Sequence, residues 1–459
     1  MAVTPPTVPS GKALRRLIPF ALDPLKGFDR YFQEYGPSFF LKAGRGRRTL
    51  VTVDPQVAQA ALQREHKYFE KSEIQSDQMA KYLGRGLLTN NGSDWLRQRR
   101  LIQPGFHRKR LLELIQGMQA ECNRIGDETL APAARSGRAI EVHELMTVLT
   151  FRIIARAIFT DGFSPKQTTE FSEAVTRIQS FIIYPIRLPF MRPIYRLIGQ
   201  EQKYRKLAGD IGLKLLDRVN ERRAATAPKS DLLQMLLDSR YEDTGEPMND
   251  QQLIDEIMII FAAGHETSAN ALTWTIHLLM QHEDILERCR EEAQSVMPNG
   301  TADLEKLSKL KYIQQVLEES MRLYPPAWVT DRIATQAVEV AGIKLRKNEV
   351  VVPYIYGLHR SEAIYDAPAV FDPDRMTTEK KRNRHPFSYI PFGGGPRLCI
   401  GHHFAMMEMK LVLAYCLQNW DFRRWKHSPN AIQPKALLTL RPNGQVNAFF
   451  RPLSPKVLT

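Results

Sequence analysis

Cysteine is scarce in this chain of 459 residues, which has four: Cys122, Cys289, Cys399 and Cys416. They lie far apart and form no Cys-x-x-Cys pair, so the sequence predicts neither a zinc site nor a disulfide framework. No segment reaches the roughly 18 uninterrupted apolar residues of a membrane-spanning helix. The proline-rich first residues contain no apolar signal-peptide core. We therefore expect a cytoplasmic protein with free thiols and no transmembrane anchor.

Acidic residues are fewer than basic ones, 50 Asp and Glu against 64 Lys and Arg, which leaves a net charge of +14. A basic protein attracts acidic partners, anionic substrates or nucleic acid. No paired Cys/His spacing and no aromatic RNA-binding box accompany the charge, so we expect no nucleic-acid partner. No linker or internal repeat divides the chain. We expect one domain over residues 1–459, without a fused reductase.

One stretch combines a glycine-rich loop with a cysteine. Residues 392–401 read Phe-Gly-Gly-Gly-Pro-Arg-Leu-Cys-Ile-Gly and run into a predicted helix that extends to about Leu417. The glycines let the backbone approach a flat ligand closely. Cys399 precedes the helix, so unpaired N–H groups and the positive end of the helix dipole face its sulfur and should lower the thiol pKa. A thiolate ligates metals. The simpler interpretation is a buried cysteine in a turn.

This spacing resembles the haem-binding signature of cytochrome P450 monooxygenases, Phe-x-x-Gly-x-Arg-x-Cys-x-Gly. Its fixed positions are filled here by Phe392, Gly395, Arg397, Cys399 and Gly401. The resemblance implies haem b (iron protoporphyrin IX), with Cys399 as the iron ligand and Phe392, Arg397 and Gly401 beside the cofactor. It also implies the fold of that family, mainly α with a smaller β-rich part. Haem is then expected between a long central helix and the helix after the cysteine loop.

Residues 250–282 predict that central helix, roughly 48 Å long and able to cross the molecule, with Asp250 as a candidate cap. In its middle, Ala263 and Gly264 are small enough to let a helix approach a planar cofactor. Gly264 costs about 1 kcal/mol relative to alanine inside a helix, so it needs a reason of this kind. We therefore expect both residues at the cofactor.

Glu266 and Thr267 follow in the same helix. Thr267 can bond back to a carbonyl one turn earlier and so bend or open the helix. A polar interruption of a buried helix is the simpler interpretation. The stretch Ala263–Thr267 is similar to the family's oxygen-activation motif, Ala-Gly-x-[Asp/Glu]-Thr. That similarity implies that the Thr267 hydroxyl holds dioxygen while Glu266 relays protons through water, which makes both residues catalytic.

Trp95 and Arg99 are four residues apart and share one face of a predicted helix. An indole N–H and a guanidinium suit a carboxylate, and haem carries two propionates. The pair resembles the family's propionate-binding Trp-x-x-x-Arg, although a core tryptophan beside a surface arginine is the simpler interpretation of the pattern alone. Arg332 is a further propionate candidate, because the family often has an arginine at that position.

Positive charge gathers after Arg99 at four residues, which are Arg100, Arg108, Lys109 and Arg110. Such a cluster is usually a solvated face. The resemblance implies that the side nearest the thiolate docks an acidic electron donor. We therefore expect this face to bind a separate ferredoxin or flavodoxin that carries electrons from NAD(P)H.

Glu319 and Arg322 place opposite charges on one helix face, usually a surface ion pair of little worth. In the family, Glu-x-x-Arg joins a later arginine in a buried network behind the haem. Arg375 supplies that partner within residues 371–375, where the aspartate at 374 departs from the family's usual glutamate. The resemblance therefore implies a structural network of Glu319, Arg322 and Arg375.

The expected substrate pocket is apolar, with four tentative lining residues, Ala262, Ala263, Val329 and Phe181. The stretch Gly86–Thr89, together with residues 103–107, is similar to that of family members that hydroxylate long-chain fatty acids. Others with similar stretches act on terpenoids, sterols or secondary metabolites. The sequence does not show whether Arg45, Arg47 or Arg187 lies near enough to hold a fatty-acid carboxylate. A haem-thiolate enzyme that uses peroxide or rearranges its substrate is a further alternative.

Several local predictions can be compared with the structure. Prolines at 185, 189 and 193 should forbid a regular helix over Phe181–Tyr195. That segment either covers the core or, as the resemblance implies, forms a mobile lid that can touch a membrane surface. Residues 66–92 should form a long loop with at most one short helix. Ser38–Leu41 with Thr49–Val53, and Leu437–Leu440 with Gln445–Phe450, should form two hairpins.

Overall fold

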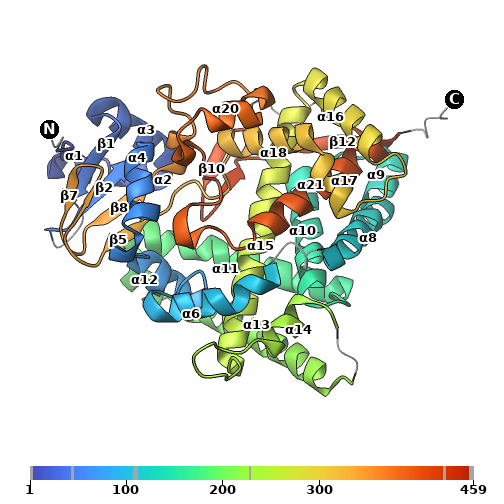
Figure 1. Ribbon diagram of the computed structural model, residues 1–459, viewed down its shortest axis with the longest axis horizontal. Helices are drawn as coiled ribbons and strands as arrows, with labels where there is room; N and C mark the ends of the chain where they lie inside the picture. The colour runs from blue at the N-terminus through green and yellow to red at the C-terminus, as the bar shows by residue number, and fades with distance from the viewer. Residues whose placement is uncertain (1–3, 43–45, 107–111, 227–228, 427–430, 454–459) are drawn as a thin grey trace.

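The computed structural model describes residues 4–42, 46–106, 112–226, 229–426 and 431–453. Helices fill most of the molecule, and short strands gather at one side and near the C-terminus (Figure 1). In the described ranges, no helix is long and apolar enough to cross a bilayer.

The helices differ widely in length. They are α1 (Ser10–Arg15), α2 (Leu17–Leu22), α3 (Pro24–Tyr35), α4 (Pro55–Gln59), α5 (Ala80–Leu83), α6 (Gly92–Ile102), α8 (Ile115–Ile125), α9 (Ala131–Ser136), α10 (Val142–Ile158), α11 (Pro165–Arg187), α12 (Arg192–Leu197), α13 (Gln200–Ala224), α14 (Leu232–Asp238), α15 (Asp250–Leu279), α16 (Glu283–Val296), α17 (Leu304–Lys309), α18 (Lys311–Leu323), α19 (Ile355–Leu358), α20 (Thr378–Arg382) and α21 (His402–Asn419).

The strands are short. They are β1 (Ser38–Lys42), β2 (Arg48–Thr52), β3 (Phe69–Glu70), β4 (Ile140–Glu141), β5 (Arg332–Ala334), β6 (Val338–Val340), β7 (Ile343–Leu345), β8 (Val350–Pro353), β9 (Trp420–Arg424), β10 (Pro434–Ala436), β11 (Leu440–Pro442) and β12 (Asn447–Pro452). The largest sheet has the order β1-β2-β8-β5-β3, and the smaller ones are β4-β12-β9, β6-β7 and β10-β11.

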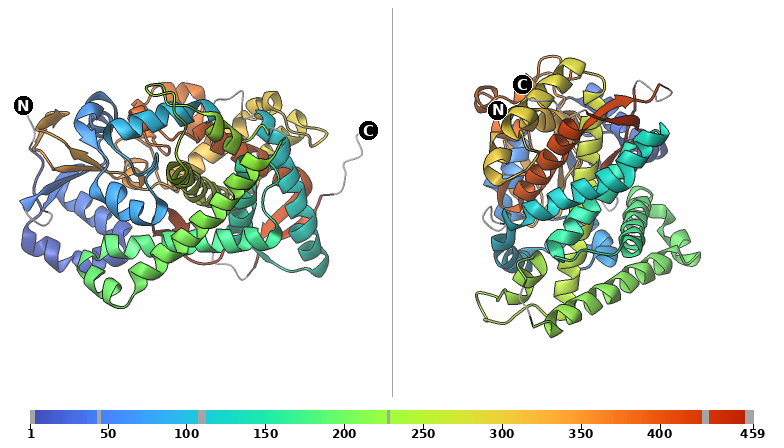
Figure 2. Two further views of the ribbon diagram at one scale, coloured as in Figure 1. Left: turned by 90° about the horizontal axis from the view of Figure 1, so that it is seen from below. Right: turned by 90° about the vertical axis from the view of Figure 1, so that its right-hand side faces the viewer.

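The central helix α15 is the predicted one, but its cap differs. The side chain of Asn249, one residue before Asp250, accepts a hydrogen bond from the backbone N–H of Gln252 at 2.8 Å. Asp250 instead lies in the first turn, where a negative charge suits the helix dipole. α15 runs through the middle of the molecule and contacts α10, α18 and α21 (Figures 1 and 2).

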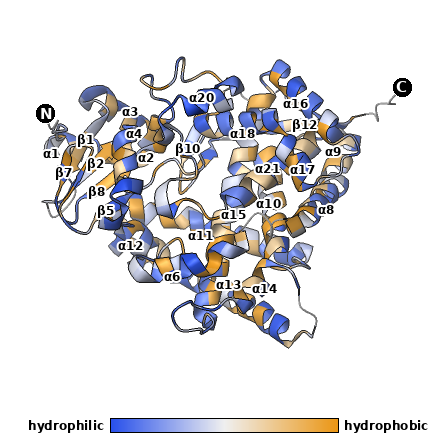
Figure 3. Cartoon of the chain, viewed as in Figure 1, coloured by the Kyte–Doolittle hydropathy of each residue, from blue (hydrophilic) through white to orange (hydrophobic). Residues whose placement is uncertain are grey.

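One hydrophobic core surrounds this helix and reaches from Met79 to Phe450. The Trp274 ring of α15 stacks on Tyr324 after α18, with 3.8 Å between ring centroids. Figure 3 shows apolar residues along α10 and α15 inside the molecule, whereas the outlying α20 is polar. Burial of these faces fixes α15 as the axis on which the site is built.

The prediction for Phe181–Tyr195 was wrong at its start. Helix α11 begins with a capping box at Ser164 and continues through Pro185 to Arg187. Pro185 lies in the last turn, where a missing N–H removes a single backbone hydrogen bond and the helix is about to end. A short 3₁₀ turn at Pro189–Met191 and helix α12 then follow.

Two further predictions are corrected. Residues 66–92 contain short helical turns, strand β3 and α5, so they are more ordered than the predicted loop. The hairpin at Ser38–Val53 is confirmed by the β1–β2 pairing, whereas the one around Pro442–Gly444 is wrong. β11 pairs with β10, and β12 pairs with β4 and β9, because the chain turns already at residues 437–439.

Candidate functional site

The middle of α15 has an accessible face although most of the helix is buried. Ala263 is exposed and Thr267 partly exposed, while their neighbours Ala262, His265 and Glu266 are buried. The Thr267 hydroxyl donates to the Ala263 carbonyl at 2.8 Å, which is the hydrogen bond that the sequence predicts. An exposed alanine inside the longest helix of the molecule indicates space for a ligand beside it.

The cysteine loop is held by backbone geometry. Gly393 and Gly395 have φ of +74° and +67°, which other residues rarely adopt, and a Cβ on Gly395 would meet the Leu62 carbonyl oxygen. The Cys399 N–H donates to the Phe392 carbonyl at 3.0 Å. Gly401 is the N-cap residue of α21. These contacts fix where the sulfur lies.

The environment of Cys399 differs from the predicted one. Its side chain has accessible surface, yet burial among protein atoms raises the pKa of the thiol, against the opposing effects of the Gly401 N–H and Arg99. Both observations hold if Cys399 borders an internal hollow. The prediction of a lowered thiol pKa was wrong for the metal-free protein, because desolvation outweighs the helix terminus. Metal coordination deprotonates such a thiol outright.

Arg99 and Trp95 share a helix face but have different surroundings. Arg99 Nη1 donates to the Leu398 carbonyl at 2.8 Å, beside Cys399. Trp95 is buried, and the Arg397 guanidinium lies 4.8 Å from the centroid of its ring. Arg397 also donates to Asn91 Oδ1 at 3.2 Å. The helix α6 therefore reaches the cysteine loop at two separate points.

Three basic residues, Lys71, Arg332 and Arg397, lie close to one another, and two of them, Lys71 and Arg397, also lie over the Trp95 ring at 6.0 and 4.8 Å from its centroid. The Lys71 ammonium is buried and donates to the carbonyls of Leu87 and Asn90 at 2.7 and 2.8 Å. Burial and the two arginines lower the pKa of Lys71 to about 6, and burial lowers that of Arg332 to about 10. Among the described residues, no carboxylate lies within ion-pair distance of these three. The cluster is a site for an anion.

Lys71 was missed by the sequence reasoning. It is one of three lysines in residues 66–92, a stretch without helical periodicity. Only the fold brings it to Arg332 and Arg397, which lie far away in sequence, so no local signal could have identified it.

Glu319, Arg322 and Arg375 lie together, as the sequence predicts. The carboxylate of Glu319 binds Arg322 through two hydrogen bonds of 2.7 and 2.8 Å, and neither side chain is exposed. Arg375 Nε lies 3.6 Å from Glu319 Oε1. The Glu-x-x-Arg pair is therefore buried rather than a surface ion pair.

These features are compared with known proteins. The family model for cytochrome P450 matches residues 15–448. The chain belongs to the cytochrome P450 family. It is a haem-dependent monooxygenase with haem b as cofactor, and it uses dioxygen, electrons from a redox partner and an apolar substrate.

Two relatives and one solved structure show what this P450 is similar to. Cyclooctatin synthase of Streptomyces melanosporofaciens is 32% identical over 366 residues, 78% of each chain. Cyclooctat-9-en-7-ol 5-monooxygenase of the same organism is 27% identical over 392 residues, 85% of this chain and 83% of that one. The crystal structure of the cytochrome P450DA heme domain covers 99% of both chains with a TM-score of 0.83 at 23% identity, which confirms the fold.

The residues of this P450 fit haem. Lys71 and Arg332, which are buried, and Arg397, which is half-buried, have no carboxylate partner among the described residues and match two propionates, and Trp95 can add an indole N–H. Cys399 has accessible surface, as an iron ligand needs. The accessible Ala263 belongs to the central helix and leaves room for a planar group.

Other predicted residues of the cofactor and the pocket have different neighbours. A Cβ on Gly264 would lie 3.2 Å from Ile154 Cγ1, so its small size serves the packing of α15 on α10. The Ala262 carbonyl accepts from Gln179 of α11, and the Phe181 ring stacks on Tyr204 of α13 with 4.2 Å between centroids. Val329 is partly accessible. Of the four predicted pocket residues, Ala263 and Val329 keep accessible surface.

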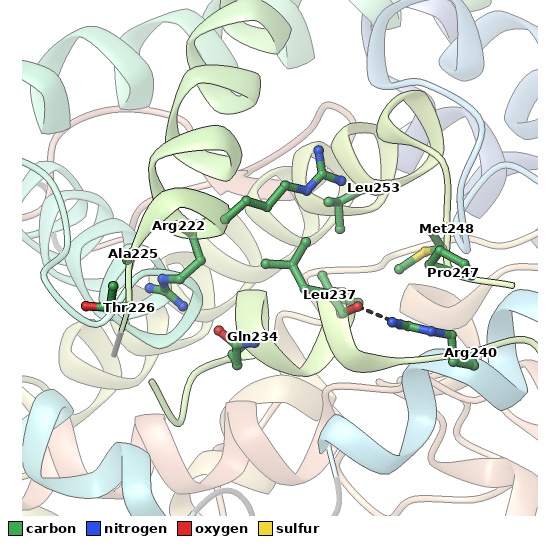
Figure 4. A pocket seen from close by; sticks show the side chains of 11 residues that line it. Arg222, Ala225, Thr226, Gln234, Leu237, Arg240, Pro247, Met248 and Leu253 are labelled. Atoms are coloured by element: carbon green, nitrogen blue, oxygen red, sulfur yellow. Dashed lines mark hydrogen bonds between the residues drawn. The ribbon is translucent and has the colours of Figure 1, made fainter. Parts of the chain in front are cut away.

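A hollow of about 410 Å³ lies elsewhere, where α13 ends and α14 and α15 begin (Figure 4). Two of its arginines are neutralised, Arg222 by Asp231 at 2.6 Å and Arg223 by Asp250 at 2.7 Å. Arg240 donates to the backbone carbonyl of Leu237. The hollow is therefore a surface depression in which two of the three lining arginines are ion-paired, and none of its lining residues belongs to the cysteine loop.

The predicted partner surface is only partly described. Arg100 is 59% exposed and reaches Glu242 at 3.4 Å. Arg108, Lys109 and Arg110 lie outside the described residues. A basic docking face near Cys399 stays a prediction.

Proposed function

We propose that this P450 hydroxylates an apolar, lipid-like molecule at a site between α15 and the cysteine loop. The observation that carries the proposal is the accessible Ala263–Thr267 face in a chain whose Cys399 also has accessible surface. Apolar residues dominate this part of the core, so a substrate there needs little polar surface.

The residues of the proposed site have separate roles. Cys399 would hold the haem iron, and Lys71, Arg332, Arg397 and Trp95 would hold the propionates. Bound haem supplies the oxidation, in which one atom of dioxygen enters a C–H bond and the other leaves as water. The Thr267 hydroxyl holds a proton at Oγ1, and Glu266 resupplies it through water.

A terpenoid alcohol is the first substrate candidate, because the relative named cyclooctat-9-en-7-ol 5-monooxygenase is matched over 85% of this chain. A long-chain fatty acid is the second, for two reasons. The Gly86–Thr89 stretch resembles that of fatty-acid hydroxylases, and Arg187 has a buried Nη2 without a hydrogen-bond partner among the described residues. Arg47 is less suited as an anchor, since it pairs with Glu73 at 3.2 Å.

The test is a titration of the ferric protein with terpenoid alcohols and with fatty acids while the Soret band is followed. A saturable shift to shorter wavelength identifies the class that displaces the axial water. Arg187→Leu should abolish a fatty-acid shift and leave a terpenoid shift unchanged. A protein that responds to neither class would contradict the proposed lipid-like substrate.

Use of dioxygen, rather than peroxide or rearrangement, is tested by Thr267→Ala. The variant should still oxidise NAD(P)H, but the two electrons should reduce dioxygen to hydrogen peroxide and form little hydroxylated product. Undiminished hydroxylation would remove Thr267 from the mechanism and favour the peroxide-using alternative.

We further infer that electrons come from an acidic ferredoxin or flavodoxin on the face near Arg100. Arg100→Glu should weaken reduction by the partner, and the effect should fade at high salt. Arg205→Glu on α13 is a matched control, since Arg205 is 50% exposed and also paired. Equal effects of both changes would argue against a local docking face.

A further inference from the structure

The two carboxylate oxygens of Glu266 have unequal surroundings. Oε1 accepts a hydrogen bond from Arg441 Nε at 2.6 Å and another from the Thr439 hydroxyl. Oε2 is buried and has no hydrogen-bond partner among the described residues. Both donors come from the β10–β11 hairpin, far from α15 in sequence. One oxygen is anchored, and the other is left for water.

The contacts continue beyond Thr439 into a chain of side chains. Asn270 Nδ2 donates to Thr439 Oγ1 at 3.0 Å, and Asn270 Oδ1 lies 3.0 Å from His143 Nε2 on α10. His143 keeps some accessible surface, whereas Asn270 and Glu266 are buried. The chain therefore leads from the buried acid to the edge of the core.

The direction of these hydrogen bonds follows from the charge of Glu266. An ionised carboxylate only accepts, so the Thr439 proton points at Oε1 and the Thr439 oxygen accepts from Asn270. Asn270 must then present its oxygen to His143, whose Nε2 therefore carries the proton. This arrangement requires a proton on His143 Nε2, which both the neutral Nε2–H tautomer and the charged imidazolium carry, and it excludes the tautomer protonated only on Nδ1. Burial lowers the pKa of His143, which favours the neutral Nε2–H tautomer over the imidazolium.

The charged groups around Glu266 favour its ionised form. Burial alone would raise the pKa of its carboxyl, but the charge and hydrogen bond of Arg441 and the Thr439 hydroxyl lower it overall. His265, on the same helix, is buried and bonds to the Phe261 carbonyl. Glu141, which caps α10, faces His143. Arg441 is thus the cation nearest to the acid.

We propose that Arg441, Thr439 and Asn270 are positioning residues for Glu266, which anchor Oε1 and leave Oε2 as the oxygen that exchanges protons with water near Thr267. The inference rests on the proposed function and adds to it the side chains that orient the acid. The Thr267 hydroxyl bonds to the Ala263 carbonyl and not to Glu266, so proton exchange between Oε2 and Oγ1 would pass through water. A carboxylate free to rotate would present this oxygen for only part of the time.

Thr439→Val tests the proposal, because it removes the hydroxyl while nearly keeping the shape of the side chain. Thr439→Ser restores the hydroxyl. Thr273→Val is a matched control, since Thr273 is an equally buried threonine on α15 whose hydroxyl donates only to the Ala269 carbonyl. In the haem-loaded enzyme we measure product and peroxide per NAD(P)H against pH. In the same proteins, ¹⁵N-histidine NMR reports the His143 tautomer, assigned by its loss in His143→Gln.

In Thr439→Val we expect the ratio of product to peroxide to fall by about tenfold, as for the loss of one hydrogen bond to a charged group. The acid limb of the pH profile should move up by about one unit, because the lost donor no longer favours the carboxylate. His143 should change from a single Nε2–H form to a mixture. Thr439→Ser should restore all three, and Thr273→Val should resemble the wild type.

Two results would overturn the proposal. One is a Thr439→Val enzyme whose ratio of product to peroxide and whose pH profile equal those of the wild type. The other is a wild-type His143 that at neutral pH carries its proton only on Nδ1, because such a ring cannot donate to Asn270 Oδ1. Failure of the proposed function is distinguishable, since a wild-type enzyme that yields no hydroxylated product leaves the NMR result standing.

Discussion

Replacement of Arg322 by alanine would leave the carboxylate of Glu319 without its main partner in the core. Neither side chain is exposed. Arg322 also donates to the carbonyls of His359, Pro368 and Val370 at 2.8, 2.8 and 3.1 Å. The variant therefore removes a buried charge and the donors of three backbone acceptors at once.

The expected cost is large. Loss of one member of a buried ion pair costs about 3–5 kcal/mol, and the orphaned carbonyls favour the upper end of that range. For a chain of 459 residues the entropy of unfolding is roughly 1 kcal/mol per kelvin, so the melting temperature should fall by about 4–5 °C. The melting temperature of Arg322→Lys should lie between those of the wild type and Arg322→Ala. Lysine keeps the positive charge but lacks the planar guanidinium that makes two parallel hydrogen bonds to the carboxylate.

The assay is urea unfolding followed by circular dichroism and by Soret absorbance. Arg288→Ala is the control, since Arg288 and Asp374 form an ion pair at 3.3 Å with both side chains about half exposed, worth at most about 1 kcal/mol. The double change Glu319→Gln with Arg322→Met should cost less than Arg322→Ala, because no charge is left unpaired. An Arg322→Ala protein within about 1 kcal/mol of the wild type would refute this reasoning.

Two further predictions concern Lys71 and Gly264. The unfolded chain binds a proton on Lys71 up to about pH 10.4 and the folded haem-free chain only below about 6, so stability rises with pH across that window. Lys71→Met should stabilise the haem-free protein near pH 7, remove that rise, and weaken haem retention; a rise that persists in its urea titrations would exclude Lys71 as the cause. Gly264→Ala should crowd Ile154, and Ile154→Val should relieve part of the cost. Additive unfolding free energies of the two changes would show that the residues do not interact.

The sequence predicts best what a few neighbouring residues determine. The cysteine loop, the Thr267 hydrogen bond to Ala263 and the Glu319–Arg322 pair all depend on spacing within one element. The long central helix follows from its apolar length. Such local patterns carry the family resemblance as well.

Contacts between distant segments were not predictable in this way. Lys71 joins Arg332 and Arg397, and Glu266 joins Thr439 and Arg441, only after the chain has folded. The strand pairing after residue 434 depends on which edges are free, which a turn signal at Pro442–Gly444 cannot reveal.

Gly264 shows how the fold adds a physical reason that the local sequence does not reveal. The sequence relates its small size to a cofactor, whereas the structure relates it to Ile154 on α10. The same holds for Cys399, where the helix terminus is present but burial dominates the pKa of the thiol. The local sequence shows which groups lie near a residue such as Cys399. The fold determines whether burial or the neighbouring helix terminus has the larger effect on its pKa.

The central claim is that Cys399 is the haem ligand. The absorption spectrum of the reduced, carbon monoxide-bound protein tests it, because a thiolate ligand moves the Soret band to longer wavelength than a nitrogen ligand does. The wild type and Cys416→Ala, which changes a buried cysteine in α21, should both show the long-wavelength band. Cys399→Ala should lose it. A Cys399→Ala protein that keeps the band, or a wild type that never shows it, would contradict the account.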